Sequence, residues 1–155
     1  MVEMMIRHYR IYLIEDAVVV PYIGREKLLY GLFNDFIQAK GRQKWIVGRQ
    51  ILYITKKMPI QLLRSVLEKE LCGNQNISYL NGAYYVRYKG QSSVLKSSAK
   101  LTIHNRVLTI SSEGGYDAET VFFECIRKID HSFLAIDIEH ERYGWLKPFK
   151  ERKFI

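Results

Sequence analysis

The amino-acid sequence alternates between apolar and polar residues from position 83 to position 112. The stretch reads AYYVRYKGQSSVLKSSAKLTIHNRVLTISS, and a period of two places one set of side chains against a core and the other set in water. Lys89-Gly90 and His104-Asn105 break the alternation with residues that are typical of chain reversals. The pattern predicts an antiparallel meander of about three short strands.

A helical period follows directly, in residues 112–129, SEGGYDAETVFFECIRKI. Apolar residues recur there every three or four positions, from Ala118 to Ile129, which is the spacing of one helix face. Asp117 stands at the start of this pattern, where its carboxylate can accept the unpaired amide hydrogens of a first helical turn. We expect Cys125 to lie on the buried face as a free thiol.

Three further segments in the first half of the chain carry helical signals. Residues 25–41 and 58–71 both show apolar residues at helical spacing, with glycine or proline near a boundary. Residues 42–55 are ambiguous, because their β-branched residues favour a strand while Trp45 and Leu52 can share a helix face. We favour a helix for this segment.

Two apolar runs outside the meander read as strands. Residues 6–14 carry apolar side chains on both sides, as a central strand does, and residues 132–139 form the last strand. No linker, low-complexity block or internal repeat interrupts residues 1–155. We therefore expect a single α+β domain with a mainly antiparallel sheet of four to five strands, covered by three to four helices.

The net charge of +8 leaves two classes of partner open. A basic protein can neutralise the phosphates of a nucleic acid, and it can equally meet an acidic protein surface. The basic residues are spread along the chain and form no single block. The distribution therefore does not favour a dedicated nucleic-acid patch.

No catalytic, metal-binding or membrane-spanning pattern is found. The four histidines, including His8 and His104, match no metal-ligand spacing, and no nucleotide-binding or hydrolase motif occurs. Asp137 and Glu139 fall on one side of the last strand, where we expect a solvated edge and no acid–base pair. We expect a cytoplasmic protein that is not an enzyme, has no cofactor or metal and does not enter a membrane.

The last fifteen residues, ERYGWLKPFKERKFI, mix aromatic and basic side chains. A disordered arm that binds nucleic acid would be a charge block with few apolar residues. Burying one large apolar side chain contributes about 1.5–3 kcal/mol, so Trp145 and Phe154 favour a segment that docks on the body.

Three stretches of the chain resemble the SirA family, sporulation inhibitors of replication. They are AETVFFECIRKI, FLAIDIEHERYGWLKPFKERKFI and RHYRIYLIEDAVVVPYIGRE, and the RYGWLxPxKERxF portion is the most specific. The resemblance implies a small cytoplasmic protein without catalytic activity. It would bind the N-terminal domain of the replication initiator DnaA one to one, as a monomer, and contact no nucleic acid directly.

The resemblance also implies a partner-binding surface made from three parts of the chain. Tyr22 matches the family aromatic that precedes the Gly-Arg-Glu run, Gln50 and Tyr53 match the QIxYIT stretch, and Pro148 matches the tail. Val18 belongs to the same set but stands where a family member carries a large aromatic. Gln50 and Tyr53 are three residues apart, so a helix would present them on one side.

Overall fold

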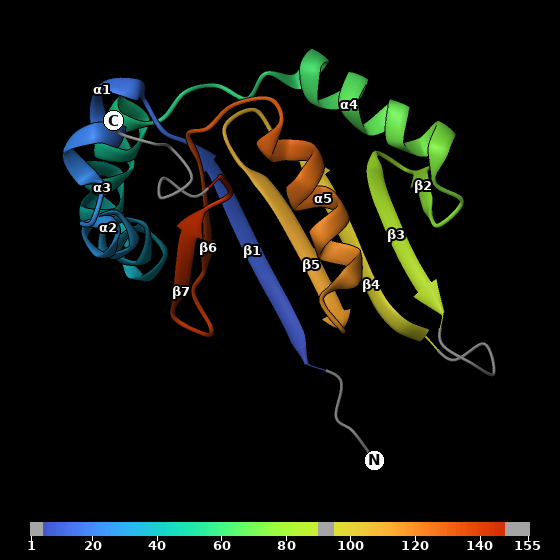
Figure 1. The fold of residues 1–155 in the computed structure, drawn as a ribbon. Helices are drawn as coiled ribbons and strands as arrows, with labels where there is room; N and C mark the ends of the chain where they lie inside the picture. The colour runs from blue at the N-terminus through green and yellow to red at the C-terminus, as the bar shows by residue number, and fades with distance from the viewer. Residues whose placement is uncertain (1–4, 90–94, 148–155) are drawn as a thin grey trace.

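The protein is described by a computed structural model over residues 5–89 and 95–147. Within these residues it is an α+β fold with one seven-stranded sheet, in the order β2-β3-β4-β5-β1-β6-β7, and every pairing in it is antiparallel (Figure 1). The strands are β1 (Ile6–Leu13), β2 (Ile77–Leu80), β3 (Ala83–Lys89), β4 (Leu95–Ile103), β5 (Leu108–Gly114), β6 (Phe133–Asp137) and β7 (Arg142–Trp145). The helices are α1 (Asp16–Val19), the 3-10 helix η1 (Val20–Tyr22), α2 (Glu26–Gln38), α3 (Gly41–Ile54), α4 (Ile60–Gly73) and α5 (Asp117–Arg127).

The expected fold class is confirmed, but the expected element counts are too low. The described residues contain seven strands and five α-helices, where four to five strands and three to four helices were expected. The additional strands, β2 and β7, are four-residue edge strands, and α1 is a single turn. Segments this short show no clear periodicity, and they form because a neighbouring element pairs with them or covers them.

A two-residue turn makes the β2–β3 hairpin. Asn81 and Gly82 have φ angles of 50° and 81°, and positive φ at both central residues matches the twist of the flanking strands. The reversal expected at His104-Asn105 is confirmed by a hydrogen bond from the His104 amide to the Val107 carbonyl. The other expected reversal includes Gly90, which lies outside the described residues.

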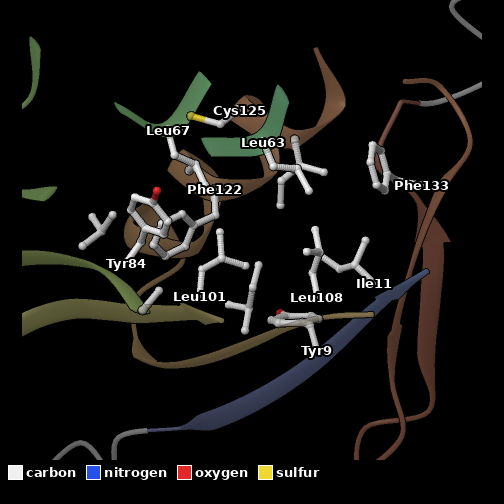
Figure 2. Close-up of a cluster of buried hydrophobic side chains, with 14 of the residues drawn as sticks. Tyr9, Ile11, Leu63, Leu67, Tyr84, Leu101, Leu108, Phe122, Cys125 and Phe133 are labelled. Carbon is white, nitrogen blue, oxygen red and sulfur yellow. The ribbon is translucent and has the colours of Figure 1, made fainter. Parts of the chain in front are cut away.

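Strand β1 is central, as expected, because its two faces are buried in two different cores. Tyr9, Ile11 and Leu13 face a core made with α4, α5 and the meander. Figure 2 shows Tyr9 and Ile11 on the same side of the sheet as the side chains of both helices. Tyr12 and Ile14 face a second core made with α2 and α3. The strand therefore fixes the helices α1–α3 to one end of the sheet (Figure 1).

Helix α5 is fastened to the sheet by a buried ion pair. The side chains of Arg7 and Glu119 are only 1% and 2% exposed, and two guanidinium nitrogens of Arg7 donate to Glu119 Oε1. Ser112 donates its hydroxyl to the same carboxylate oxygen at 3.0 Å, and Arg7 also donates to the Gly114 carbonyl at 2.9 Å. The ion pair and the additional hydrogen bonds offset the free-energy cost of removing the two charges from water.

The first turn of α5 is capped by a residue from another strand. The Ser97 hydroxyl in β4 accepts the amide hydrogen of Ala118 at 3.0 Å. Asp117, expected to fill this role, is the first residue of the helix and instead lies 3.9 Å from Lys96 as an exposed ion pair. The expectation for Asp117 is wrong because Ser97 is 20 residues away in sequence and comes close only through the sheet.

Candidate protein-binding surface

Helix α3 forms from the segment that was ambiguous in sequence, and the expected helix is confirmed. Val47 and Ile51, four residues apart, are 4% and 8% exposed and pack into the second core. Gly48, the residue directly after Val47, faces α2, where a Cβ would come within 3.1 Å of the Phe36 ring. Glycine at this position therefore permits close packing of α3 against α2.

The outward side of α3 is unusually apolar for a solvent-facing surface. The exposed fractions are 63% for Trp45, 51% for Leu52 and 83% for Tyr53, and Gln50 is also exposed. The face defined by Trp45 and Leu52 thus points away from the core. Large apolar side chains gathered on a monomer's surface are typical of interaction sites.

The segment α1–η1 lies beside the C-terminal end of α3. The Glu15 amide donates to the Ile54 carbonyl at 2.8 Å, and the Lys56 amide donates to the Leu13 carbonyl at 2.7 Å. Lys56 also pairs with Asp16 across the junction at 3.2 Å. These contacts hold the two segments together, and Figure 1 shows α1 and α3 in the same group of helices.

The expected binding residues occupy these two adjoining segments. Val18 and Tyr22, in α1–η1, are partly buried and pack against the second core. Gln50 and Tyr53 are exposed on α3. Pro148 lies outside the described residues, so its expected place beside this surface stays a prediction.

Val20 extends this surface, although it is not among the residues expected to bind a partner. It is 71% exposed, between the partly buried Val18 and Tyr22. Its signal in the sequence is the next residue, Pro21, which lies within η1 and limits this helical run to a short turn. We define Val18, Val20, Tyr22, Gln50 and Tyr53 as the α1–α3 surface.

The described part of the tail, residues 142–147, lies against the body of the protein. Strand β7 pairs with β6, the Leu146 amide donates to the Phe133 carbonyl at 3.0 Å, and the Trp145 indole nitrogen donates to Glu26 Oε2 at 3.3 Å. The Tyr143 ring lies 5.1 Å from the Tyr30 ring in α2. The docking is therefore confirmed for residues 142–146, and residues 148–155, including Phe154, lie outside the described part.

Asp137 corrects the expectation of a solvated strand edge. It is 1% exposed and ends β6, while Glu139 is exposed in the following turn. The Asp137 carboxylate accepts hydrogen bonds from Arg142 at 2.9 Å and from the His140 ring at 2.8 Å. Burial pushes the pKa of Asp137 up, but these hydrogen bonds outweigh it and leave the pKa below its ordinary value.

This network predicts a pH-dependent cost for the substitution Asp137→Asn. Ionised Asp137 contributes its full stabilisation of the folded state when the pH is above the pKa of an unfolded aspartate, about 3.9. This contribution is lost as the pH falls through the lower pKa that Asp137 has in the folded state. We expect the free energy of unfolding of the variant to be about 1–3 kcal/mol lower than that of the wild type at pH 7. The difference should shrink between pH 4 and pH 3 in urea titrations.

Glu139→Gln is the matched control, because this side chain is exposed two residues away. It should leave the free energy of unfolding nearly unchanged at each pH. A gap between wild type and Asp137→Asn that is equally large at pH 7 and pH 3 would contradict the role assigned to the ionised carboxylate.

The residues with metal-ligating chemistry are engaged in protein contacts. Among the described residues, Asp16, Asp130 and His131 have ligand atoms within 4.8 Å of one another. Asp16 already pairs with Lys56 and accepts a hydrogen bond from Ser132, and Asp130 accepts the Ser132 amide hydrogen at 2.9 Å. The cluster therefore connects the loop before β6 to the start of α1 through an ion pair and hydrogen bonds.

Two further residues with potentially reactive side chains, His8 and Cys125, lie in structural positions. His8 contacts the Ser111 hydroxyl at 3.1 Å on the neighbouring strand, a structural contact. Cys125 is buried, and burial raises the pKa of its thiol to about 11, so the thiol stays protonated and is a poor nucleophile.

In the described part of the chain, no helix combines the length and apolar character needed to cross a membrane.

The sequence is similar to known proteins over most of its length. The sequence matches the family described as "Sporulation inhibitor of replication protein SirA" over residues 7–150. A protein of Bacillus subtilis (strain 168) with the same description is 34% identical to this chain over 153 residues. That match covers 96% of this chain and 99% of the relative.

Proposed function

The chain belongs to the SirA family of sporulation inhibitors of replication, and from this premise we propose that it inhibits replication by binding the N-terminal domain of the initiator DnaA. The family is described by inhibition and not by a chemical reaction. The proposed inhibitor acts in the cytoplasm during sporulation, as a monomer that binds one initiator domain and needs no cofactor.

The observation that carries the proposal is the exposure of Tyr53. Its side chain is 83% exposed on a helix whose other face is fixed by Val47 and Ile51. A rigid aromatic ring contributes a large contact area and loses little conformational entropy on binding. An exposed tyrosine on a preformed helix is therefore well suited to dominate the binding energy.

The adjoining segment supplies the second half of the surface. Val20 is exposed beside the partly buried Val18 and Tyr22, and backbone hydrogen bonds hold this segment against the end of α3. Because the surface is formed before binding, association costs little ordering of the chain. Val18 leaves room where a family member has a larger side chain, so we assign more of the energy to Tyr53.

Isothermal titration of the full chain with the isolated N-terminal domain of DnaA tests the proposal. We expect saturable binding with one initiator domain per chain. An interface at the low end of about 1,200–2,000 Å² would suffice for such binding. The absence of heat and of complex formation at micromolar concentrations would contradict it.

Direct binding to nucleic acid is the second candidate, and the open face of the sheet favours it. Arg10, Arg87 and Lys100 are exposed there. However, Arg87 and Lys100 both lie over the Tyr85 ring, at 5.4 and 5.8 Å from its centroid. That ring is consequently not free to stack on bases, as single-strand binding proteins require.

A salt series separates the two functions. A protein that neutralises six to ten phosphates loses about 10³–10⁵ in affinity between 50 and 200 mM salt. We expect gel-shift assays to show no DNA complex at the higher salt, whereas the initiator complex persists in titrations at the same salt. Tight DNA binding at 200 mM salt, with no binding of the initiator domain, would favour the second candidate.

A further inference from the structure

Helix α3 borders a surface groove through side chains other than Gln50 and Tyr53. The groove runs between α3 and the end of the sheet and has a volume of about 610 Å³. Its apolar lining includes Tyr12, Phe36, Trp45, Leu52 and Val107, and neither Gln50 nor Tyr53 contributes to it. The α1–α3 surface and this groove therefore use different side chains of the same helix.

The charge around the groove has a single sign. Four basic residues line it, namely Arg10, Lys44, Arg49 and Arg106, and its described lining contains no carboxylate. Across the described residues, none of the four forms an ion pair with an acidic side chain. Within the described part of the chain, no acidic side chain compensates the positive potential of the groove.

The basic side chains are held in position by contacts other than ion pairs. Lys44 lies 4.8 Å from the centroid of the Phe36 ring, and Arg49 lies 5.3 Å from that of Trp45. Arg106 donates to the Thr55 carbonyl at 3.0 Å. These contacts place charge directly beside apolar surface and leave donor groups available to a ligand.

We propose that this groove binds an acidic amphipathic helical segment of a partner protein. Apolar side chains on one face of that helix would contact Trp45 and Leu52, and its carboxylates would pair with Arg49 and Lys44. An amphipathic helix seated in an apolar groove is a recurring mode of peptide recognition. Charge complementarity selects an acidic segment because like charges across an interface are strongly unfavourable.

The same charge argument disfavours two other occupants. A second copy of the chain would bring a net charge of +8 toward a basic groove. The last residues of the chain, KPFKERKFI, carry four basic residues and one acidic residue. Nucleic acid also has the right charge, and the groove contains aromatic rings. Tyr12 is buried, however, and Lys44 and Arg49 lie over the Phe36 and Trp45 rings, which leaves less ring surface on which bases could stack.

Selection from a random peptide display library tests the proposal without assuming a sequence. The full-length protein is the target, and the double variant Trp45→Ala/Arg49→Glu is used for counter-selection. We expect enriched peptides with net negative charge and apolar residues at positions i, i+3 or i+4, and i+7. Enrichment of neutral or basic peptides, or of none that depend on the groove, would overturn the proposal.

A matched control makes similar substitutions on a different helix. Leu62 and Arg64 are exposed on α4, so Leu62→Ala/Arg64→Glu also removes one exposed apolar side chain and reverses one charge. In fluorescence anisotropy with a selected peptide, the groove variant should weaken binding about tenfold or more. The α4 variant and Tyr53→Ala should leave it within about twofold, and equal losses in all three would refute the groove.

A single-stranded oligonucleotide provides the competing probe in the same assay. We expect it to bind less tightly than the selected peptides at physiological salt and not to displace them. An oligonucleotide that binds more tightly than any selected peptide, and loses that binding in Trp45→Ala/Arg49→Glu, would overturn the proposal in favour of a nucleic-acid groove.

Discussion

Replacing Glu119 with alanine is expected to lower the free energy of unfolding by about 3–5 kcal/mol, because it leaves Arg7 charged and unpaired inside the protein. Arg7 is 1% exposed and lies beneath the Tyr116 ring, 4.4 Å from its centroid, so water cannot readily replace the lost carboxylate. The substitution also removes the acceptor of the Ser112 hydroxyl. Urea denaturation followed by circular dichroism measures the difference.

Two comparisons identify the cause of that loss. Lys96→Ala breaks an exposed ion pair near the same helix end, at 3.9 Å, and should cost no more than about 1 kcal/mol. Replacing both buried partners, as Arg7→Met/Glu119→Leu, should cost less than Glu119→Ala alone, because no unpaired charge remains. A loss below about 1 kcal/mol in Glu119→Ala would show that water or another group satisfies Arg7.

Replacing Tyr53 with alanine is expected to weaken binding of the DnaA N-terminal domain by more than about 2 kcal/mol, or roughly thirtyfold in Kd. The ring is 83% exposed, so its removal should change the free energy of unfolding by less than about 0.5 kcal/mol. The loss would therefore report contact with the partner and not damage to the fold. Isothermal titration and urea denaturation of the same variant give the two quantities.

Tyr79→Ala is the matched control for this substitution. Tyr79 is 49% exposed on β2, at the opposite edge of the sheet from the helices α1–α3 (Figure 1). It should leave the affinity unchanged. If Tyr53→Ala keeps wild-type affinity while its fold is intact, Tyr53 does not belong to the binding surface.

Much of the sheet was predictable because its strands are long enough to show a period. The alternation over residues 83–112 predicts strands that the structure contains as β3, β4 and β5, and the apolar faces of residues 6–14 predict the central β1. The four-residue strand β7 could not be predicted in this way. It forms because β6 offers a free edge and because a turn with Glu141 at a φ of 51° reverses the chain.

Residues whose partners lie far away in sequence were the ones least accessible to prediction. The capping role of Ser97 and the burial of Asp137 both depend on groups that folding alone brings together. The same holds for the surface of α3. Helical spacing fits Trp45 with Leu52 as well as Val47 with Ile51, and the packing of α2 and the sheet decides which pair is buried.

Nuclear magnetic resonance tests residue by residue whether the α1–α3 surface binds the initiator. The isotope-labelled chain, of 18.3 kDa, is titrated with the unlabelled N-terminal domain of DnaA while amide shifts are followed. We expect the largest shift changes in residues 16–22 and in the second half of α3. Changes concentrated in β2, β3 and α4, or no changes at saturating initiator domain, would contradict it.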